Sequence, residues 1–196
     1  MKTLLTLKKV QSLLAMSLLM IAANSHADWQ LDQSNSSINF VTIKKGNIAE
    51  SHTFGEFSGT LTSDKATITI ATSSVDTKVD IRNERMREFL FETASFPNIS
   101  ISADIKSIMS NLETGQSSLV AIPATLELHG VTKQIVVSVR VSKLNADSYL
   151  VSSSEPVLIR AKDYALLEGV LKLSSLVNNL PIAETVPVSF SLQFNK

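Results

Sequence analysis

Apolar and polar residues alternate with a period of two through most of the chain after residue 28. The clearest run is Val186, Val188, Phe190, Leu192 and Phe194, in which every second residue is apolar. Such spacing places apolar side chains on one face of an extended strand and is typical of antiparallel sheets with one buried face. Similar runs occur at 38–42, 68–70, 99–105, 122–128, 135–141 and 149–151. The pattern predicts about eight antiparallel strands.

An Arg-rich segment between residues 77 and 97 interrupts this alternation. Met86, Phe89 and Leu90 fall near one helical face, with arginines around it. Phe96-Pro97 is expected to end the helix, because the residue before a proline avoids the helical conformation. The segment therefore predicts one helical insertion in a mostly β fold.

A second helical insertion is predicted from Asp163 to Leu180. Asp163 is placed as an N-cap, and Pro181 follows the expected end. The apolar residues recur at helical spacing, at Leu166, Val170, Leu173 and Val177. The two insertions could plug the ends or one side of the fold or gate the mouth of a ligand site, and the sequence leaves both interpretations open.

A strand-rich domain of this size must protect the edges of its sheet. Closure into a barrel does this directly, so we expect an antiparallel eight-stranded β-barrel with two helical insertions, with a β-sandwich as the alternative. An eight-stranded barrel is about the smallest that either fills its interior with side chains or holds one small ligand. Periodicity alone favours neither a filled nor a hollow interior.

Residues 1–27 have the features of a secretory signal peptide. Three lysines precede a mostly apolar stretch at 10–23, and Ser25-His26-Ala27 provides a small-x-small cleavage site. The apolar stretch is short for a membrane span, so we expect no stable membrane anchor. The sequence thus predicts export to the periplasm and a single domain at 28–196.

Composition excludes several classes of function. The chain has 18 Lys and Arg, 18 Asp and Glu and no Cys. Three of the lysines lie in the predicted signal peptide, so the remainder is mildly acidic, which argues against nucleic acid as a partner. Without Cys there is no disulfide and no thiolate chemistry.

The sequence offers little for catalysis or metal binding. Beyond residue 27 the histidines are His52 and His129, which are far apart and lack metal-ligand spacing. We interpret His129 as a structural residue that donates to a turn carbonyl, and His52 as a surface or strand residue. No phosphate loop and no Gly-x-Ser-x-Gly elbow occur. We therefore expect a protein that is not an enzyme and has neither a metal nor a cofactor.

Two motifs resemble the YceI-like family, which comprises lipocalin-like periplasmic proteins associated with polyisoprenoid binding. In the Arg-rich segment the matching residues are Arg82, Met86, Arg87, Phe91, Phe96, Pro97 and Ile99. The stretch 124–133 resembles the family's Leu-x-Leu-His-Gly-Val-Thr-Lys hairpin. Weaker matches lie at 29–40, 57–61 and 159–164. Asn83, Arg85 and Ala165 depart from the pattern, where the family usually has Asp, His and Gly.

The resemblance implies a lipocalin-like barrel with an elongated apolar pocket for an isoprenoid chain, such as a quinone or a polyprenyl phosphate. The chain would act as a carrier or reservoir without chemistry, stabilised by burial of about 0.8 kcal/mol per CH₂. The alternation and the first helix supply the candidate lining residues, which are Ile38, Phe40, Ile68, Ile70, Met86, Phe89, Ile101, Leu126, Val137, Phe190 and Leu192.

Arg82 and Arg85 are candidate contacts for a polar headgroup, because guanidinium forks suit phosphate. The competing interpretation is that nearby acidic residues neutralise both arginines on a solvated helix surface. These residues are Asp76, Asp80, Glu84 and Glu88.

Two further possibilities stay open at this stage. One is a stress-related interaction or adaptor module with a packed barrel core, for which the second helix is the docking surface. The other concerns Pro187 in the last strand, which marks either an edge open to homodimer formation or an outward position.

Overall fold

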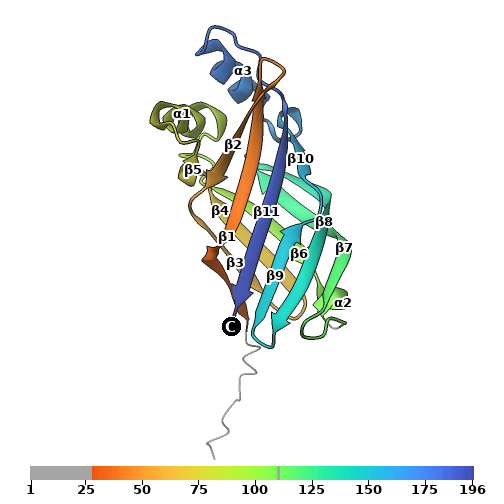
Figure 1. Ribbon diagram of the computed structural model, residues 1–196. Coiled ribbons are helices and arrows are strands. Elements are labelled where there is room, and N and C mark those ends of the chain that lie inside the picture. The colour runs from red at the N-terminus through yellow and green to blue at the C-terminus, as the bar shows by residue number, and fades with distance from the viewer. Residues whose placement is uncertain (1–27, 110) are drawn as a thin grey trace, which may run out of the picture.

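The alternating runs form strands in the computed structural model of the protein, which describes residues 28–109 and 111–196 (Figure 1). The predicted signal peptide, residues 1–27, lies outside the described residues. The strands are β1 (Trp29–Lys44), β2 (Ile48–Phe54), β3 (Phe57–Leu61), β4 (Lys65–Ala71), β5 (Val75–Asp76), β6 (Asn98–Asp104), β7 (Ser117–Leu128), β8 (Val131–Asn145), β9 (Ser148–Ser153), β10 (Val157–Arg160) and β11 (Thr185–Asn195).

Eight of these strands close into a barrel. Their order around the ring is β1, β3, β4, β6, β7, β8, β9 and β11, and antiparallel pairing of β11 with β1 completes it. In that closing pair Ile38 lies opposite Phe190. The predicted antiparallel eight-stranded barrel is confirmed, and the sandwich alternative is wrong.

The two closing strands extend beyond the ring at one end. The last part of β1 pairs with β2, with Phe40 opposite His52, and the first part of β11 pairs with β10. Pro187 lies opposite Leu158 in this second pair, so β10 covers that position. The sequence did not predict β2, because Glu50 and His52 occupy two of its inward positions and break the apolar alternation.

The first predicted helix is present but shorter than expected. It consists of α1 (Asp80–Arg85) and a following π-helical turn, η2 (Met86–Leu90). It ends at Leu90 rather than at Phe96-Pro97, because Glu92 adopts a positive φ of 46° and turns the chain. Three other short helices are η1 (Thr72–Ser74), α2 (Lys106–Met109) and η3 (Ala161–Tyr164).

The second predicted helix is shorter than the sequence indicated at both ends. Asp163 lies inside η3 and does not cap a helix, since Ala165 has a left-handed φ of 55° that separates η3 from α3 (Leu167–Ser175). The far end is also corrected from Leu180 to Ser175. Asn178 and Asn179 both have positive φ and cannot continue the helix.

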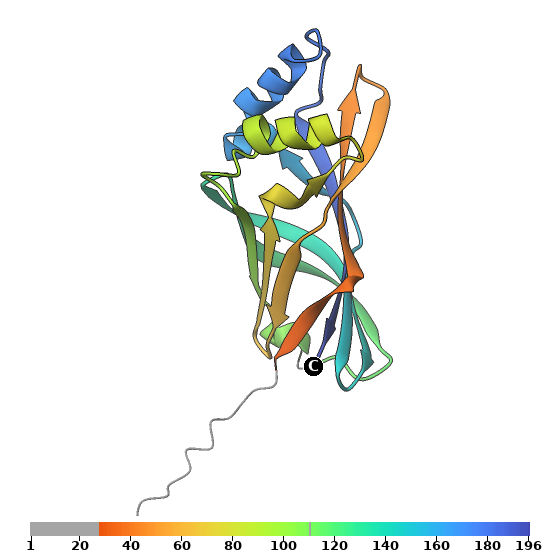
Figure 2. The ribbon, with the colours of Figure 1, turned by 90° about the vertical axis from the view of Figure 1, so that its left-hand side faces the viewer.

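The helices α1 and α3, with η2 between β5 and β6, sit at the same end of the barrel as the β1–β2 extension, whereas α2 lies at the opposite end (Figures 1 and 2). There α3 packs directly on η2. A Cβ on Gly169 of α3 would lie 2.5 Å from the Phe89 carbonyl oxygen, so only glycine allows this approach. The opposite end is closed by buried side chains, among them Leu61, Ile105 and Phe194.

Candidate ligand-binding cavity

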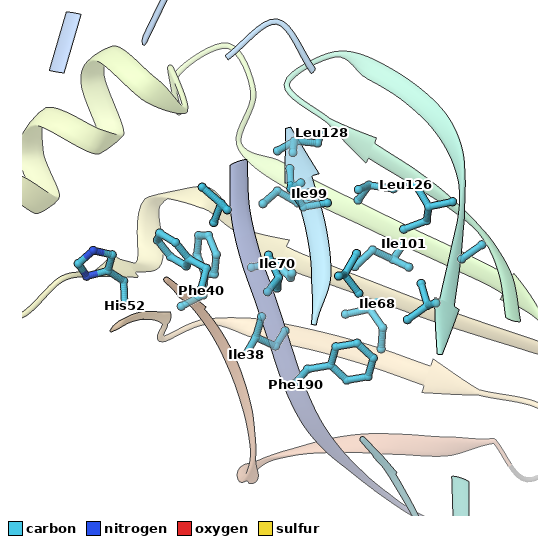
Figure 3. A pocket seen from close by; sticks show the side chains of 18 of the residues that line it. Ile38, Phe40, His52, Ile68, Ile70, Ile99, Ile101, Leu126, Leu128 and Phe190 are labelled. Atoms are coloured by element: carbon cyan, nitrogen blue, oxygen red, sulfur yellow. The ribbon is translucent and has the colours of Figure 1, made fainter. Parts of the chain in front are cut away.

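The inward faces of the barrel strands surround a cavity of about 350 Å³. This volume falls within the range of small-molecule sites. Strands on all sides of the ring contribute aliphatic and aromatic side chains to its wall (Figure 3). The polar residues in the lining all come from β1, β2 and α1, and they are Thr42, Lys44, Glu50, His52, Arg82 and Arg85. The cavity is thus an apolar chamber with polar groups at one end.

The cavity reaches solvent at the end covered by the helices. Lys44, Arg82 and Val177 line it and are each partly exposed. Leu61 and Phe194 line its other end and are buried. A long molecule could therefore enter only with its apolar part leading, and its polar end would remain among the charged residues.

Ten of the eleven predicted lining residues contribute to this wall. Cross-strand register explains how they meet, since Ile101 of β6 lies opposite both Ile68 of β4 and Leu126 of β7 (Figure 3). The ten residues are Ile38, Phe40, Ile68, Ile70, Met86, Ile101, Leu126, Val137, Phe190 and Leu192.

Phe89 is the exception, and its predicted position is corrected. The Phe91 N–H donates to the Met86 carbonyl at 2.9 Å, which closes a five-residue π-turn rather than an α-helical turn. In the wider turn Met86, Leu90 and Phe91 line the cavity, whereas the Phe89 ring lies 5.4 Å from Nζ of Lys172 on α3.

Three charged side chains form a bridge across the cavity mouth. Glu50 Oε2 accepts from Lys44 Nζ at 2.6 Å and from Arg82 Nη1 at 2.9 Å. The hydrogen bond from Lys44 and the charge of Arg82 hold the pKa of Glu50 below its ordinary value. The bridge joins β1, β2 and α1, so the first helix is fixed to the extended hairpin.

Arg85 is placed differently from Arg82. It lines the cavity beside the bridge, and within the described residues its guanidinium has no hydrogen bond and no ion pair. The four acidic residues expected to neutralise Arg82 and Arg85 make no ion pair with either in the described chain, since Asp76 pairs with Lys78 and Arg82 pairs with Glu50. Those four residues thus form no ion pair with the two arginines, and the charged residues that line the cavity, Lys44, Glu50, Arg82 and Arg85, carry a net positive charge.

His52 lines the cavity, although the sequence indicated only a surface or strand residue; it lies in strand β2 and not on the surface. Its side chain is only 3% exposed on β2, and Nε2 lies 2.8 Å from Thr42 Oγ1. Nδ1 is buried and has no partner among the described residues. Burial, with the charge of Arg82, lowers the pKa of His52, so the imidazole is neutral at neutral pH. The period-two spacing of Glu50, His52 and Phe54 is the signal that could have identified it.

His129 lies outside the cavity, in the turn of the β7–β8 hairpin. His129 and Gly130 have φ of 50° and 74°, the left-handed pair of a two-residue turn, as the motif predicted. Its ring nitrogens make no hydrogen bond within the described chain, and the ring packs 4.2 Å from that of Phe96. The prediction that His129 donates to a turn carbonyl is therefore wrong.

In the part of the chain that the structure describes, no three His, Asp or Glu side chains gather as a metal site would require. None of the described helices has the length and apolar character needed to cross a membrane.

Comparison with known proteins gives a match over nearly the whole barrel. The model of the YceI-like domain matches residues 29–194. No curated protein matches the chain. Among solved structures, the polyisoprenoid binding domain from Saccharophagus degradans implicated in plant cell wall breakdown is 37% identical, covers 85% of this chain and 97% of its own, and superposes with a TM-score of 0.81.

BcnA of Burkholderia cenocepacia shares the fold at greater distance. It is 19% identical, covers 83% of this chain and 98% of its own, and has a TM-score of 0.65. The barrel, its helix-covered mouth and the family match at 29–194 together establish the relationship. The chain belongs to the YceI-like family.

Proposed function

We propose that the protein binds a long isoprenoid in the barrel and acts as its carrier or reservoir without chemistry. The observation that carries this proposal is the apolar cavity, which has polar groups only at its mouth. The 37% identical relative from Saccharophagus degradans is a polyisoprenoid binding domain, which supports the same ligand class here. The predicted signal peptide supports a periplasmic location.

Burial of the chain would supply most of the affinity. Each CH₂ removed from water contributes about 0.8 kcal/mol, so several isoprene units outweigh the cost of immobilising one ligand. The adaptor alternative requires a packed core, whereas the barrel holds a cavity of about 350 Å³. We therefore favour the carrier.

Native mass spectrometry of the protein recovered from a bacterial periplasm without detergent tests this proposal. Organic extraction and lipid identification follow. A co-purifying isoprenoid at near one-to-one stoichiometry is the expected result. A bare polypeptide that also refuses added quinone and polyprenyl phosphate would refute it.

The proposal also concerns the chemistry of the ligand's headgroup. Arg82 is already engaged by Glu50, whereas Arg85 lines the mouth without a partner among the described residues. A half-buried guanidinium beside an apolar chamber favours an anion, since phosphate oxygens accept its forked donors. We therefore favour a polyprenyl phosphate over a quinone.

Arg85→Ala tests the headgroup. We expect roughly 10- to 150-fold weaker binding of a geranylgeranyl phosphate, because one charge-assisted hydrogen bond contributes about 1.5–3 kcal/mol, and no loss for geranylgeraniol. Arg87→Ala is the matched control, since Arg87 lies on η2, donates to the Ser73 carbonyl and does not line the cavity. Equal losses for both ligands, measured by fluorescence competition, would exclude a headgroup role for Arg85.

A further inference from the structure

The end of the molecule around the cavity mouth exposes apolar side chains from two elements far apart in sequence. Ile48, at the start of β2, is 44% exposed, and Leu171 and Val177, on and after α3, are 51% and 39% exposed. We call residues 43–49 and 171–183 together the mouth tip. Figure 2 shows the β1–β2 hairpin and the α3 segment at the same end.

Backbone hydrogen bonds hold the two parts of the mouth tip together. The Lys45 N–H donates to the Pro181 carbonyl at 3.0 Å, and the Ala183 N–H donates to the Ile43 carbonyl at 2.8 Å. Lys44 and Ile182 also form an isolated β-bridge. The mouth tip is therefore one surface rather than two independent loops.

The mouth tip has a one-sided charge in an otherwise acidic chain. Its charged residues are Lys44, Lys45 and Lys172, and neither part contains an Asp or a Glu. Lys44 pairs with the adjacent Glu50, so Lys45 and Lys172 supply the positive charge of this surface. Lys45 and Lys172 are exposed. Exposed cations beside exposed aliphatic side chains are the composition of surfaces that bind anionic lipid bilayers.

We propose that the mouth tip docks on an anionic lipid bilayer, with Ile48 and Leu171 entering the headgroup region and the lysines contacting lipid phosphates. Val177 is both exposed and part of the cavity lining, so apolar surface continues from the mouth tip into the barrel. A docked barrel would thus receive an apolar chain without exposing it to water. Only that transfer step rests on the proposed function, whereas docking does not.

Vesicle flotation of the protein recovered from the periplasm tests the proposal. Vesicles of phosphatidylcholine alone are compared with vesicles that also contain phosphatidylglycerol. We expect binding to the anionic vesicles, weakened by salt. The double variant Lys45→Gln with Lys172→Gln should bind about 30-fold more weakly, by loss of two cations from the interface. The variant Lys65→Gln with Lys106→Gln, which changes exposed lysines elsewhere, should bind like the parent.

The apolar part is tested with Ile48→Ser and Leu171→Ser together. The matched control is Leu119→Ser with Val136→Ser, since both side chains are exposed, on β7 and β8 respectively. Loss of flotation in the first variant alone supports docking. Equal loss of flotation in both variants, or absence of binding of the parent protein to anionic vesicles, would overturn the proposal. So would a dimer of the parent protein that dissociates in the Ile48→Ser, Leu171→Ser variant in the absence of lipid. Failure of the isoprenoid proposal would appear as an empty cavity with flotation intact.

Discussion

At the scale of single residues, Ala165 carries strain that a different residue would relieve. Its φ of 55° lies in the left-handed region, at the joint between η3 and α3. The Leu166 N–H donates to the Ala161 carbonyl at 3.0 Å across this joint, so the conformation is needed to start α3. A residue with a Cβ loses about 1–2 kcal/mol in that region.

We predict that Ala165→Gly raises the free energy of unfolding by about 0.5–1 kcal/mol. The gain from relieved strain exceeds the added entropy that glycine gives the unfolded chain. Urea unfolding measures the change. Ala146→Gly is the control, because Ala146 lies in an exposed turn without positive φ, and it should be neutral or destabilising. A loss of stability in Ala165→Gly would contradict the strain argument.

The residues that line the cavity could be predicted from the sequence where the period-two alternation of a strand determines which side chains point inward. Alternation placed Ile68 and Ile101 in the cavity, because strand register follows apolarity. Asn83 shows the limit. Its Oδ1 accepts from the Thr77 N–H at 2.7 Å and from the Thr77 hydroxyl at 2.6 Å. That contact depends on a turn whose geometry no residue pattern encodes, so the departure at Asn83 gave no sign of its role.

At the scale of elements, the packing of α3 against η2 depends on one glycine, Gly169. A Cβ at position 169 would lie 2.5 Å from the Phe89 carbonyl oxygen and 2.9 Å from the Leu90 Cα. Both are backbone atoms, so neither can swing aside. Helical periodicity predicted α3, but it contained no information on the partner against which α3 packs.

We predict that Gly169→Ala destabilises the protein by about 1–3 kcal/mol, the usual cost of overpacking. An exposed helical Gly→Ala change stabilises instead, so the sign identifies the contact. Urea unfolding gives the magnitude, and hydrogen exchange at 167–175 should show faster opening of α3. Glu168→Ala, at an exposed position of the same helix, is the control and should leave both unchanged. A stabilised Gly169→Ala would show that α3 does not pack on η2 in this way.

Elements with polar functional residues were the hardest to predict. The strand β2 places Glu50 and His52 toward the cavity, where alternation would require apolar residues. These polar residues make the cavity mouth chemically distinct, and because they interrupt the apolar alternation, a hydrophobicity pattern does not identify β2 as a strand.

At the scale of the whole molecule, the hollow interior makes a prediction about β7. Ala124 lines the cavity, whereas Ala121 on the same strand is exposed and faces outward. We predict that Ala124→Phe abolishes isoprenoid binding and changes the free energy of unfolding by less than about 2 kcal/mol, because the ring enters empty space. Ala121→Phe should bind like the parent. Unchanged ligand content in Ala124→Phe, measured by native mass spectrometry, would place the ligand outside the barrel.

The barrel class and the number of strands in its ring could be predicted from the chain, because eight half-buried strands leave few ways to protect their edges. The hollow interior could not, since filled and empty barrels have the same alternation. Whether apolar side chains meet across the axis depends on the strand tilt and on end-closing residues such as Phe194, which only the assembled ring determines.

The pairing of β1 with β11 also determines when the chain can fold. Gln30 lies opposite Asn195, so the ring joins residues from both ends of the described chain and cannot close before the last strand is available. Contacts of such sequence separation form slowly. A chain still being synthesised therefore lacks the partner for its own first strand. The barrel could not close during that period, and the predicted export would then meet a chain whose ring is still open.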